Sequence, residues 1–186
     1  MIRPYEEEDM EDVVRIWLEA SLQAHDFIPR RFWEESAADM RSLYLPMSDE
    51  IVLHVDDDTG KPDAFLAFVD SFLAAFFVAP EAQGRGLGSR MFRIACRMHP
   101  ELSLCVYKEN VRAVEFYRRH GLAVLCERME EKTGHVELVM GMRCDGEEKT
   151  ERPKMQRAAA GGAPMREQSS AGKKNVQLLS NSWNIQ

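Results

Sequence analysis

Three glycines stand close together at the point where an apolar segment gives way to a helical pattern. Phe72–Val78 is apolar at every position, and Gly84, Gly86 and Gly88 lie between it and the helical pattern of residues 89–99. A turn of this kind presents unpaired backbone N–H groups at the positive end of a helix dipole, and glycines let a bulky anion approach that backbone. The spacing therefore predicts a phosphate-binding loop.

The residues around these glycines limit the kind of phosphate site. No Lys-Ser or Lys-Thr pair follows them, as a nucleoside-triphosphate loop requires, and GRGLGS at Gly84–Ser89 is not the GxGxxG dinucleotide pattern. A nucleoside-triphosphate site is therefore excluded. Another phosphate-bearing ligand, such as a nucleotide, is left open by the loop alone.

A second segment combines an asparagine, an aromatic pair and a glycine at helical spacing. Asn110 precedes a helical pattern and can cap its first turn. Phe116 is expected to face the core, Tyr117 lies about two turns inside the helix, and Gly121 closes it. This combination is much rarer than a glycine-rich turn, so it discriminates more sharply between functions.

The remaining apolar periodicity predicts how these segments are positioned. A central segment that is apolar on both faces, such as 72–78, is typical of a strand buried on both sides. Strand–helix–strand–helix order with flanking hairpins predicts an α/β or α+β domain with a mixed sheet. The expected helices are 8–23, 30–45 (one helix or two short ones), 89–99 and 112–119, and the expected strands are 51–56, 64–69, 72–78, 102–107, 124–127 and 136–142.

Length and composition restrict the domain organisation. The 186 residues suffice for one domain with a hydrophobic core, and the apolar periodicity runs over 1–143. Residues 144–186 lose this pattern and are rich in Gly, Ser, Gln, Lys and Glu, which is typical of disorder. We therefore expect one domain, 1–143, and a disordered tail, 144–186, to which no function is assigned.

The charge distribution argues against a nucleic-acid partner. The chain carries a net charge of −7, and residues 144–186 hold seven Lys or Arg against five Asp or Glu, so residues 1–143 carry −9. Affinity for nucleic acid comes largely from Lys and Arg that neutralise phosphates. An acidic domain is better suited to a cationic substrate, although acidic surfaces also serve solubility.

Other features favour a cytoplasmic protein without a metal or a membrane segment. No apolar run approaches the about 20 residues of a membrane span, and the N-terminus is acidic. The cysteines lack a CxxC pair and the histidines lack ligand spacing, so solvent-facing or turn positions are expected for most histidines. These residues are Cys96, Cys105, Cys126 and Cys144, and His54, His99, His120 and His135.

Taken together, QxxGxG at Gln83–Gly88 and NxxAxxFYxxxGL at Asn110–Leu122 resemble the GNAT family of acetyl-CoA-dependent N-acetyltransferases. Three further stretches resemble the small bacterial YiaC and YjaB type of this family: FLAAFFVAP at Phe72–Pro80, RMHPELSLCVYKEN at Arg97–Asn110, and His25–Ile28. The resemblance covers roughly residues 1–143. It implies a mixed central sheet of about six or seven strands flanked by about four helices.

The resemblance also implies roles for particular residues. The pantetheine arm of acetyl-CoA would pair with the backbone near Phe77 and Val78, where a strand amide would act as oxyanion donor, worth on the order of 3 kcal/mol. Tyr117 would protonate the CoA thiolate, since a phenol with a reference pKa of about 10 is protonated at neutral pH. The pyrophosphate would rest on the loop residues Gln83, Gly84, Arg85, Gly86, Leu87, Gly88 and Ser89.

The roles of Asn110 and His25 each have two interpretations. Asn110 either contacts the pantetheine or simply caps its helix, and it can do both. His25 is a candidate general base, because an imidazole suits proton removal at neutral pH, but it can equally be a packing residue beside a helix-capping Asp26. Asp26 and Asp70 are the other candidates, since the central strand carries no carboxylate, and water can also relay the proton.

Three functions are compatible with these motifs. The first is an enzyme that acetylates a primary amine by direct attack in a ternary complex, either a protein lysine or a small-molecule amine. The second is a non-catalytic acyl-CoA-binding sensor, and the third is a protein for another phosphate-bearing ligand, which the NxxAxxFY segment disfavours. The enzyme is preferred, with acetyl-CoA as co-substrate, no metal, no nucleic acid, no membrane, and a monomeric or homodimeric state.

Overall fold

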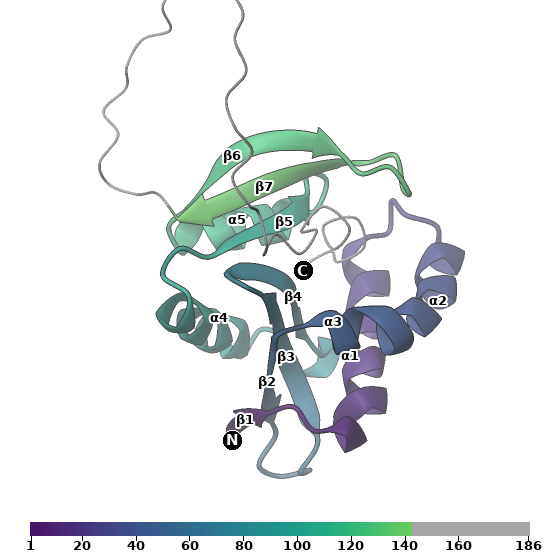
Figure 1. The fold of residues 1–186 in the computed structure, drawn as a ribbon, viewed down its shortest axis with the longest axis vertical. Coiled ribbons are helices and arrows are strands. Elements are labelled where there is room, and N and C mark those ends of the chain that lie inside the picture. The colour runs from purple at the N-terminus through teal and green to yellow at the C-terminus, as the bar shows by residue number, and fades with distance from the viewer. Residues whose placement is uncertain (143–186) are drawn as a thin grey trace, which may run out of the picture.

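The computed structural model describes residues 1–142, so the predicted tail, 144–186, and the predicted domain boundary at 143 lie outside the described residues. A seven-stranded sheet with the order β1-β2-β3-β4-β5-β7-β6 organises this part of the chain (Figure 1). The predicted mixed sheet is thereby confirmed. Its strands are β1 (Ile2–Pro4), β2 (Glu50–Val55), β3 (Pro62–Val69), β4 (Phe72–Val78), β5 (Ser103–Tyr107), β6 (Leu122–Met129) and β7 (Val136–Met142).

Helices cover both faces of this sheet. Both α1 and α4 pack on β3 and β4, and Figure 1 places them on opposite sides of these strands, while α5 packs on β5 and β6. All six β4 residues after Phe72 are buried, as predicted for a central strand. The helices are α1 (Met10–Ala24), α2 (Arg30–Asp39), α3 (Leu45–Met47), α4 (Leu87–Met98) and α5 (Val111–Arg119), with short turns η1 (Glu7–Asp9) and η3 (Pro80–Ala82) and a π-helical segment η2 (Met40–Tyr44).

The sheet divides between β4 and β5, its one parallel neighbour pair within residues 1–142. These strands pair at a single position, Phe72 with Ser103, whereas β3 pairs with β4 and β5 with β7 along most of their lengths. In Figure 1 the strands β2–β4 and the strands β5–β7 accordingly fan apart. The gap opens toward the carboxyl ends of β4 and β5, the edge at which α/β proteins usually bind ligands.

Two parts of the fold differ from the sequence-based expectation. β1 was not expected, because three residues at the sheet edge are too short for a period-2 pattern. The helical stretch expected over 30–45 is α2 followed by the π-helical turn η2 and the short α3. The hairpin of β2 and β3 and the final antiparallel pair of β6 and β7 are confirmed.

A buried histidine fastens the glycine loop's helix to the sheet. His54 is not solvent-facing as expected, because its Nδ1 lies 2.5 Å from Asp63 Oδ1 on β3 and its Nε2 contacts the guanidinium of Arg90 on α4. Since Arg90 can only donate, Nε2 accepts and Nδ1–H donates to Asp63. The imidazole thus links the first turn of α4 to two strands.

We predict that Phe65→Ala destabilises the protein by about 3–5 kcal/mol. Phe65 is fully buried opposite Phe77 across β3 and β4, with ring centroids 5.6 Å apart, so its removal leaves a cavity between the strands. Urea unfolding measures the change. Met129→Ala is the control, because that side chain is 60% exposed and its loss should change stability by less than about 0.5 kcal/mol. A similar loss in both variants would contradict the assignment of Phe65 to the core.

Candidate active site

A cavity of about 480 Å³ lies where β4 and β5 diverge. The end of α1 and the loop after it line the cavity, as do the last residues of β4, the glycine loop, the residues just after β5, and α5 from its first residue to its last. One cavity therefore joins the two segments whose motifs were recognised in the sequence. Its lining consists of Ala20, Gln23, Ala24, Asp26, Phe27, Phe76, Val78, Gln83, Gly84, Gly86, Gly88, Ser89, Glu109, Asn110, Val111, Arg112, Ala113, Phe116 and Arg119.

The glycine loop requires glycine at two positions. Gly84 and Gly86 have φ angles of +75° and +79°, and Gly86 is the residue before the first turn of α4. A side chain at such an angle costs roughly 1–2 kcal/mol. The side chain of Gln83 holds the loop against β4, since its Nε2 donates to the Val78 carbonyl at 3.0 Å.

Most of the residues predicted to bind acetyl-CoA line this cavity. Phe77, Arg85 and Leu87 do not: side chains alternate along a strand, so Phe77 packs into the core while Phe76 and Val78 reach the cavity. Arg85 is exposed and Leu87 is buried in the first turn of α4. The predicted binding residues that do line the cavity are Val78, Gln83, Gly84, Gly86, Gly88, Ser89 and Asn110.

Two arginines add positive charge to the α5 wall. Arg112 and Arg119 are seven residues apart, about two helical turns, so they share one face of α5, and both line the cavity. Together with the amino end of α4 they form an environment suited to phosphate. The sequence-based analysis did not single them out, although their helical spacing was a usable signal.

Asn110 both caps α5 and contacts the loop after α1. Its Oδ1 accepts the Ala113 backbone N–H at 3.1 Å, which confirms the capping interpretation. Because this bond fixes the orientation of the amide, the Nδ2 group is directed to His25 Nε2 at 3.4 Å. The contact with pantetheine stays a prediction.

His25 is a buried residue that does not itself line the cavity. Only 1% of it is exposed, its ring stacks on Trp33, and its Nδ1 lies 3.1 Å from the Ser21 carbonyl. Since a carbonyl only accepts, Nδ1 carries the proton and Nε2 accepts from Asn110. This arrangement holds the loop after α1 against α5.

Tyr117 is fully buried and does not itself line the cavity, whereas its neighbour Phe116 does. Its ring lies 5.3 Å from those of Phe92 and Phe116, and its hydroxyl has no hydrogen-bond partner among residues 1–142. Burial raises the pKa of Tyr117 well above its ordinary value, so the phenol remains protonated. Phe116 packs against the core, as expected, and also lines the cavity. An unpaired buried hydroxyl costs about 1–3 kcal/mol, which a ligand atom that accepts its proton would offset.

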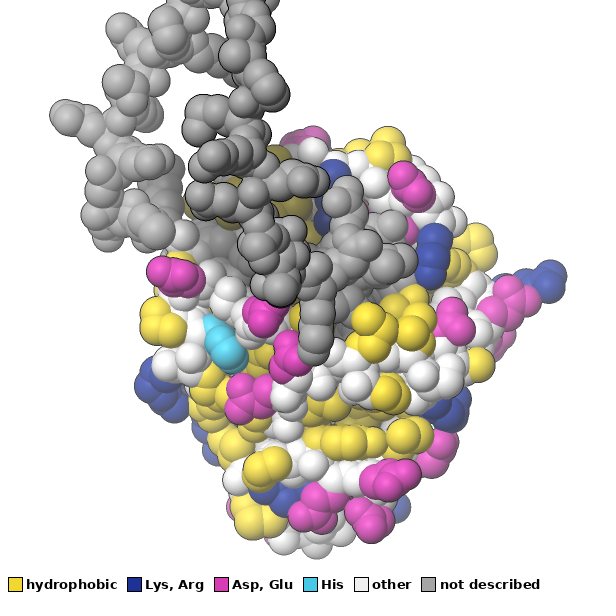
Figure 2. Space-filling model, viewed as in Figure 1, with side chains coloured by type: hydrophobic (Ala, Val, Ile, Leu, Met, Phe, Trp, Pro, Cys, Tyr) yellow, Lys and Arg dark blue, Asp and Glu magenta, His cyan; other side chains and the backbone are white. Residues whose placement is uncertain are grey.

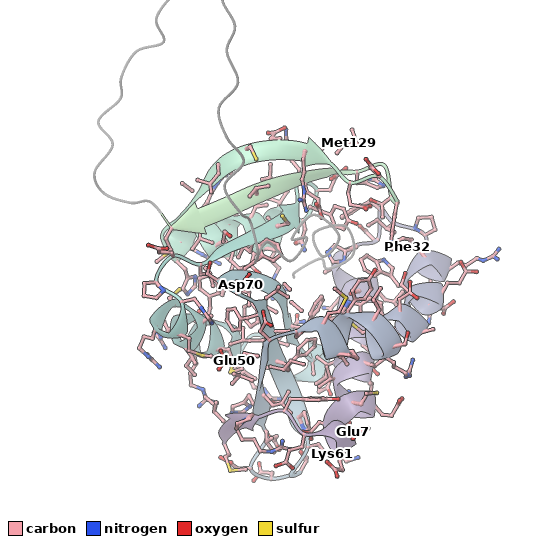
Figure 3. All side chains as sticks on the ribbon, in the orientation of Figure 1. Glu7, Phe32, Glu50, Lys61, Asp70 and Met129 are labelled. Atoms are coloured by element: carbon pink, nitrogen blue, oxygen red, sulfur yellow. The ribbon has the colours of Figure 1, made fainter. Side chains whose placement is uncertain are left out.

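The candidate carboxylates are distributed unevenly. Asp26 lines the cavity, whereas Asp70 lies in the β3–β4 turn, with a φ of +53°, at the end of β4 opposite the cavity (Figure 3). A third carboxylate, Glu109, was not identified from the sequence, because its significance depends on His135. His135 Nδ1 lies 2.9 Å from Glu109 Oε1, and Glu109 lines the cavity.

Comparison with known proteins decides the family. The model of the acetyltransferase (GNAT) family matches residues 10–122, which is more than half of the chain. The chain belongs to the GNAT family. Among curated GNAT relatives, the peptidyl-lysine N-acetyltransferase YiaC of Escherichia coli K12 is 32% identical over 126 residues, 67% of this chain and 84% of YiaC. The peptidyl-lysine N-acetyltransferase YjaB of the same strain is 31% identical over 123 residues, 66% of this chain and 82% of YjaB.

Solved GNAT structures agree with the fold. The solution structure of apo YjaB from Escherichia coli has a TM-score of 0.68 at 26% identity and covers 76% of this chain and 95% of its own. A PaiA N-acetyltransferase from Thermoplasma acidophilum, solved with coenzyme A, has a TM-score of 0.61 at 15% identity, covering 77% and 98%. The predicted family, fold and class of activity, an acetyl-CoA-dependent acyltransferase, are confirmed.

No cysteine among residues 1–142 of this GNAT domain lines the cavity. Burial raises the pKa of the Cys105 thiol to about 12, so it is not a nucleophile at neutral pH. Cys96 is half-buried and Cys126 is exposed, while Cys144 lies outside the described residues. In residues 1–142, no helix is long and apolar enough to cross a membrane.

We predict that Gly86→Ala weakens acetyl-CoA binding tenfold or more, because the residue that starts α4 can no longer hold its φ of +79° without strain. Isothermal titration measures the affinity. The matched control is Gly60→Ala, at a φ of +68° in the β2–β3 turn and equally free of steric contact. Both variants should lose about 1 kcal/mol of stability, but only Gly86→Ala should lose affinity. Equal affinities would show that this loop does not hold the co-substrate.

Proposed function

We propose that this protein transfers the acetyl group of acetyl-CoA to the side-chain amine of protein lysines, by direct attack of the amine on the thioester. The observation that carries the proposal is the cavity between the diverging strands β4 and β5, with the glycine loop on one wall and α5 on another. The lining carboxylates Asp26 and Glu109, the lining arginines, and Tyr117, whose ring contacts the lining residue Phe116, each suit one part of such a reaction.

The glycine loop and the amino end of α4 would hold the phosphate end of acetyl-CoA. The backbone of Gly84–Ser89 and the amino end of α4 favour the pyrophosphate, and Gly88 leaves the space that a Cβ would occupy, 3.8 Å from Phe76 and Phe116. Arg112 and Arg119 add charge-assisted contacts to phosphate. The pantetheine arm would run along β4 near Phe77 and Val78, and a backbone amide there would stabilise the oxyanion.

Tyr117 would donate a proton to the departing thiolate. Its hydroxyl is buried and remains protonated at neutral pH, and within residues 1–142 it has no hydrogen-bond partner to compete for that proton. A thiolate formed in a water-poor site is more basic than it is in water, which favours this transfer. No nucleophilic cysteine is needed, in agreement with the raised pKa of Cys105.

A protein lysine is the preferred acceptor for two reasons. The relatives YiaC and YjaB are named peptidyl-lysine N-acetyltransferases, and residues 1–143 carry a net charge of −9, which attracts a cationic acceptor. Acidic side chains are spread over the visible face in Figure 2, so this attraction is general rather than specific for one sequence. A small-molecule amine is the alternative. A cytoplasmic location and a monomeric or homodimeric state also remain predictions.

We predict that Tyr117→Phe lowers kcat by about 10²–10⁴-fold, because the variant cannot protonate the leaving thiolate. Release of free thiol from acetyl-CoA is measured with lysine peptides, polyamines and amino acids as acceptors. The affinity for acetyl-CoA should stay within about twofold, because the change removes one oxygen from a buried ring.

Three results would redirect this assignment. Full activity of Tyr117→Phe would leave the enzyme in place but remove the general acid. Activity on polyamines without activity on peptides would identify a small-molecule acetyltransferase. Tight acetyl-CoA binding without turnover on any amine would favour a sensor. Tyr5→Phe serves as the control. This tyrosine lies between β1 and η1, packs against the core and does not line the cavity.

A further inference from the structure

A β-bulge lies at the end of β3 that is closest to the cavity. The register of β2 against β3 shifts between His54 and Val55, which leaves Asp63 as the extra residue on β3. In Figure 3, Lys61 and Asp70, which lie just before and just after β3, mark its two ends, and the bulge is at the Lys61 end. Bulges re-aim the side chains beside them and are over-represented next to active sites.

Asp63 connects this bulge to the start of the glycine loop. Its backbone carbonyl accepts the N–H of Ala79, the residue directly after β4, at 2.7 Å. Its carboxylate accepts the Nδ1–H of His54. A single residue outside the regular ladder therefore bonds both the chain that leads into the loop and the imidazole on β2.

The imidazole connects the far end of the loop to the same bulge. His54 Nε2 accepts from the guanidinium of Arg90, and the Arg90 backbone N–H donates to the Gly86 carbonyl at 3.1 Å. That backbone bond closes the first turn of α4 on its N-cap residue, Gly86. Both ends of the segment 79–90 are thus bonded to Asp63, one directly and one through His54.

We propose that His54, Asp63 and Arg90 are positioning residues that hold the segment 79–90 in the shape that binds the pyrophosphate of acetyl-CoA. These three side chains are called the loop clamp below. None of them lines the cavity, so the clamp acts through Gly86 and Ser89, which do. The inference rests on the proposed binding of acetyl-CoA by the glycine loop.

The loop needs support because its own side chains provide little. Gly84 and Gly86 have no side chain to pack, and Arg85 is exposed. Gln83 bonds a carbonyl of β4, and Leu87 is buried at the start of α4. Glycine also loses more conformational freedom on ordering than any other residue. A site that binds an anion through backbone N–H groups gains affinity when those groups are fixed before the ligand arrives.

A role in stability alone would not need a polar clamp. His54 is 7% exposed, and burying a polar side chain costs free energy unless it is hydrogen-bonded. Buried polar pairs can often be replaced by apolar residues without loss of stability. The hydrogen bonds of the clamp differ from apolar contacts because they restrict direction as well as distance, which a binding loop requires.

The first test removes the guanidinium of the clamp. Arg90→Met is compared with Arg93→Met, which removes the same charge from an exposed position of the same helix outside the clamp. Because a positioning hydrogen bond is lost, we expect Arg90→Met to raise the Kd of acetyl-CoA about tenfold and Arg93→Met to leave it within about twofold. Isothermal titration of the full chain measures both. The kcat and the KM for a lysine peptide should not change.

Two results of this comparison would overturn the inference. An unchanged Kd in Arg90→Met would show that the clamp does not affect the loop. An equal loss of affinity in Arg93→Met would show that positive charge on α4, and not position, decides the affinity.

The second test restores one bond of the clamp. The amide of Asn reaches the place of the imidazole Nδ1, whereas that of Gln reaches the place of Nε2, where its oxygen can accept from Arg90. We therefore expect His54→Asn to bind acetyl-CoA as weakly as Arg90→Met, and His54→Gln to recover most of the affinity. The double variant of His54→Asn and Arg90→Met should bind no more weakly than either single variant, because both remove the same bond. Equal affinities of the two His54 variants would overturn the inference.

Amide hydrogen exchange tests the clamp without any ligand. In the free protein, the amides of Gly84–Ser89 should exchange about tenfold faster in Arg90→Met than in the wild type or in Arg93→Met. The amides of β6 and β7 should be unchanged, since β4 and β5 separate these strands from the clamp. Exchange that is faster in all of these segments, or in none, contradicts the inference.

These measurements separate the inference from the proposed function. Wild-type binding of acetyl-CoA that persists unchanged in Arg90→Met and His54→Asn contradicts the inference and leaves the proposed function intact. A wild type that binds no acetyl-CoA contradicts the proposed function, and the exchange rates of the loop then decide whether the clamp holds it. Unfolding temperatures identify any His54 variant that fails to fold, and Arg90→Met, at an exposed position, decides in that case.

Discussion

The separation of β4 from β5 is the constraint on which the rest of the site depends. One paired position, Phe72 with Ser103, joins the two halves of the sheet, and aromatic rings support the halves beyond it. Phe92 on α4 lies 6.0 Å from Phe76 on β4 and 5.5 Å from Phe116 on α5. These contacts pack α4 and α5 against each other and against β4, next to the place where the sheet divides. If the strands paired along their length, the cavity could not exist.

The separation also gives the cavity two chemically different regions. The amino end of α4 and the arginines Arg112 and Arg119 provide positive charge, while Asp26 and Glu109 provide negative charge. No side chain of residues 1–142 caps the amino end of α4, whose N-cap residue is Gly86, whereas Asn110 caps the amino end of α5. The amino end of α4 thus keeps backbone N–H groups that suit an anion, and that of α5 is used to hold Asn110. A reaction between an anionic co-substrate and a cationic acceptor needs both regions in one cavity.

Much of this molecule could be predicted from local pattern. The glycines of the loop, the Asn110 cap and the buried strand β4 were identified from residue type and spacing, because each depends on the backbone within a few residues. The family followed from two such segments in order. The short edge strand β1 and the π-helical turn η2 were missed, since neither has a distinct periodicity.

Contacts between distant parts of the chain were decided only by the tertiary structure. His25 meets Asn110 across 85 residues and Glu109 meets His135 across 26, and neither pairing has a signal in the sequence. The loop after α1, the loop after β5 and the β6–β7 turn meet through the contacts of His135 with Phe27 and with Glu109. The sequence by itself determined which segments can bind phosphate or cap a helix, because those properties are local. The tertiary structure decided which titratable groups share the cavity, because that depends on where the sheet divides.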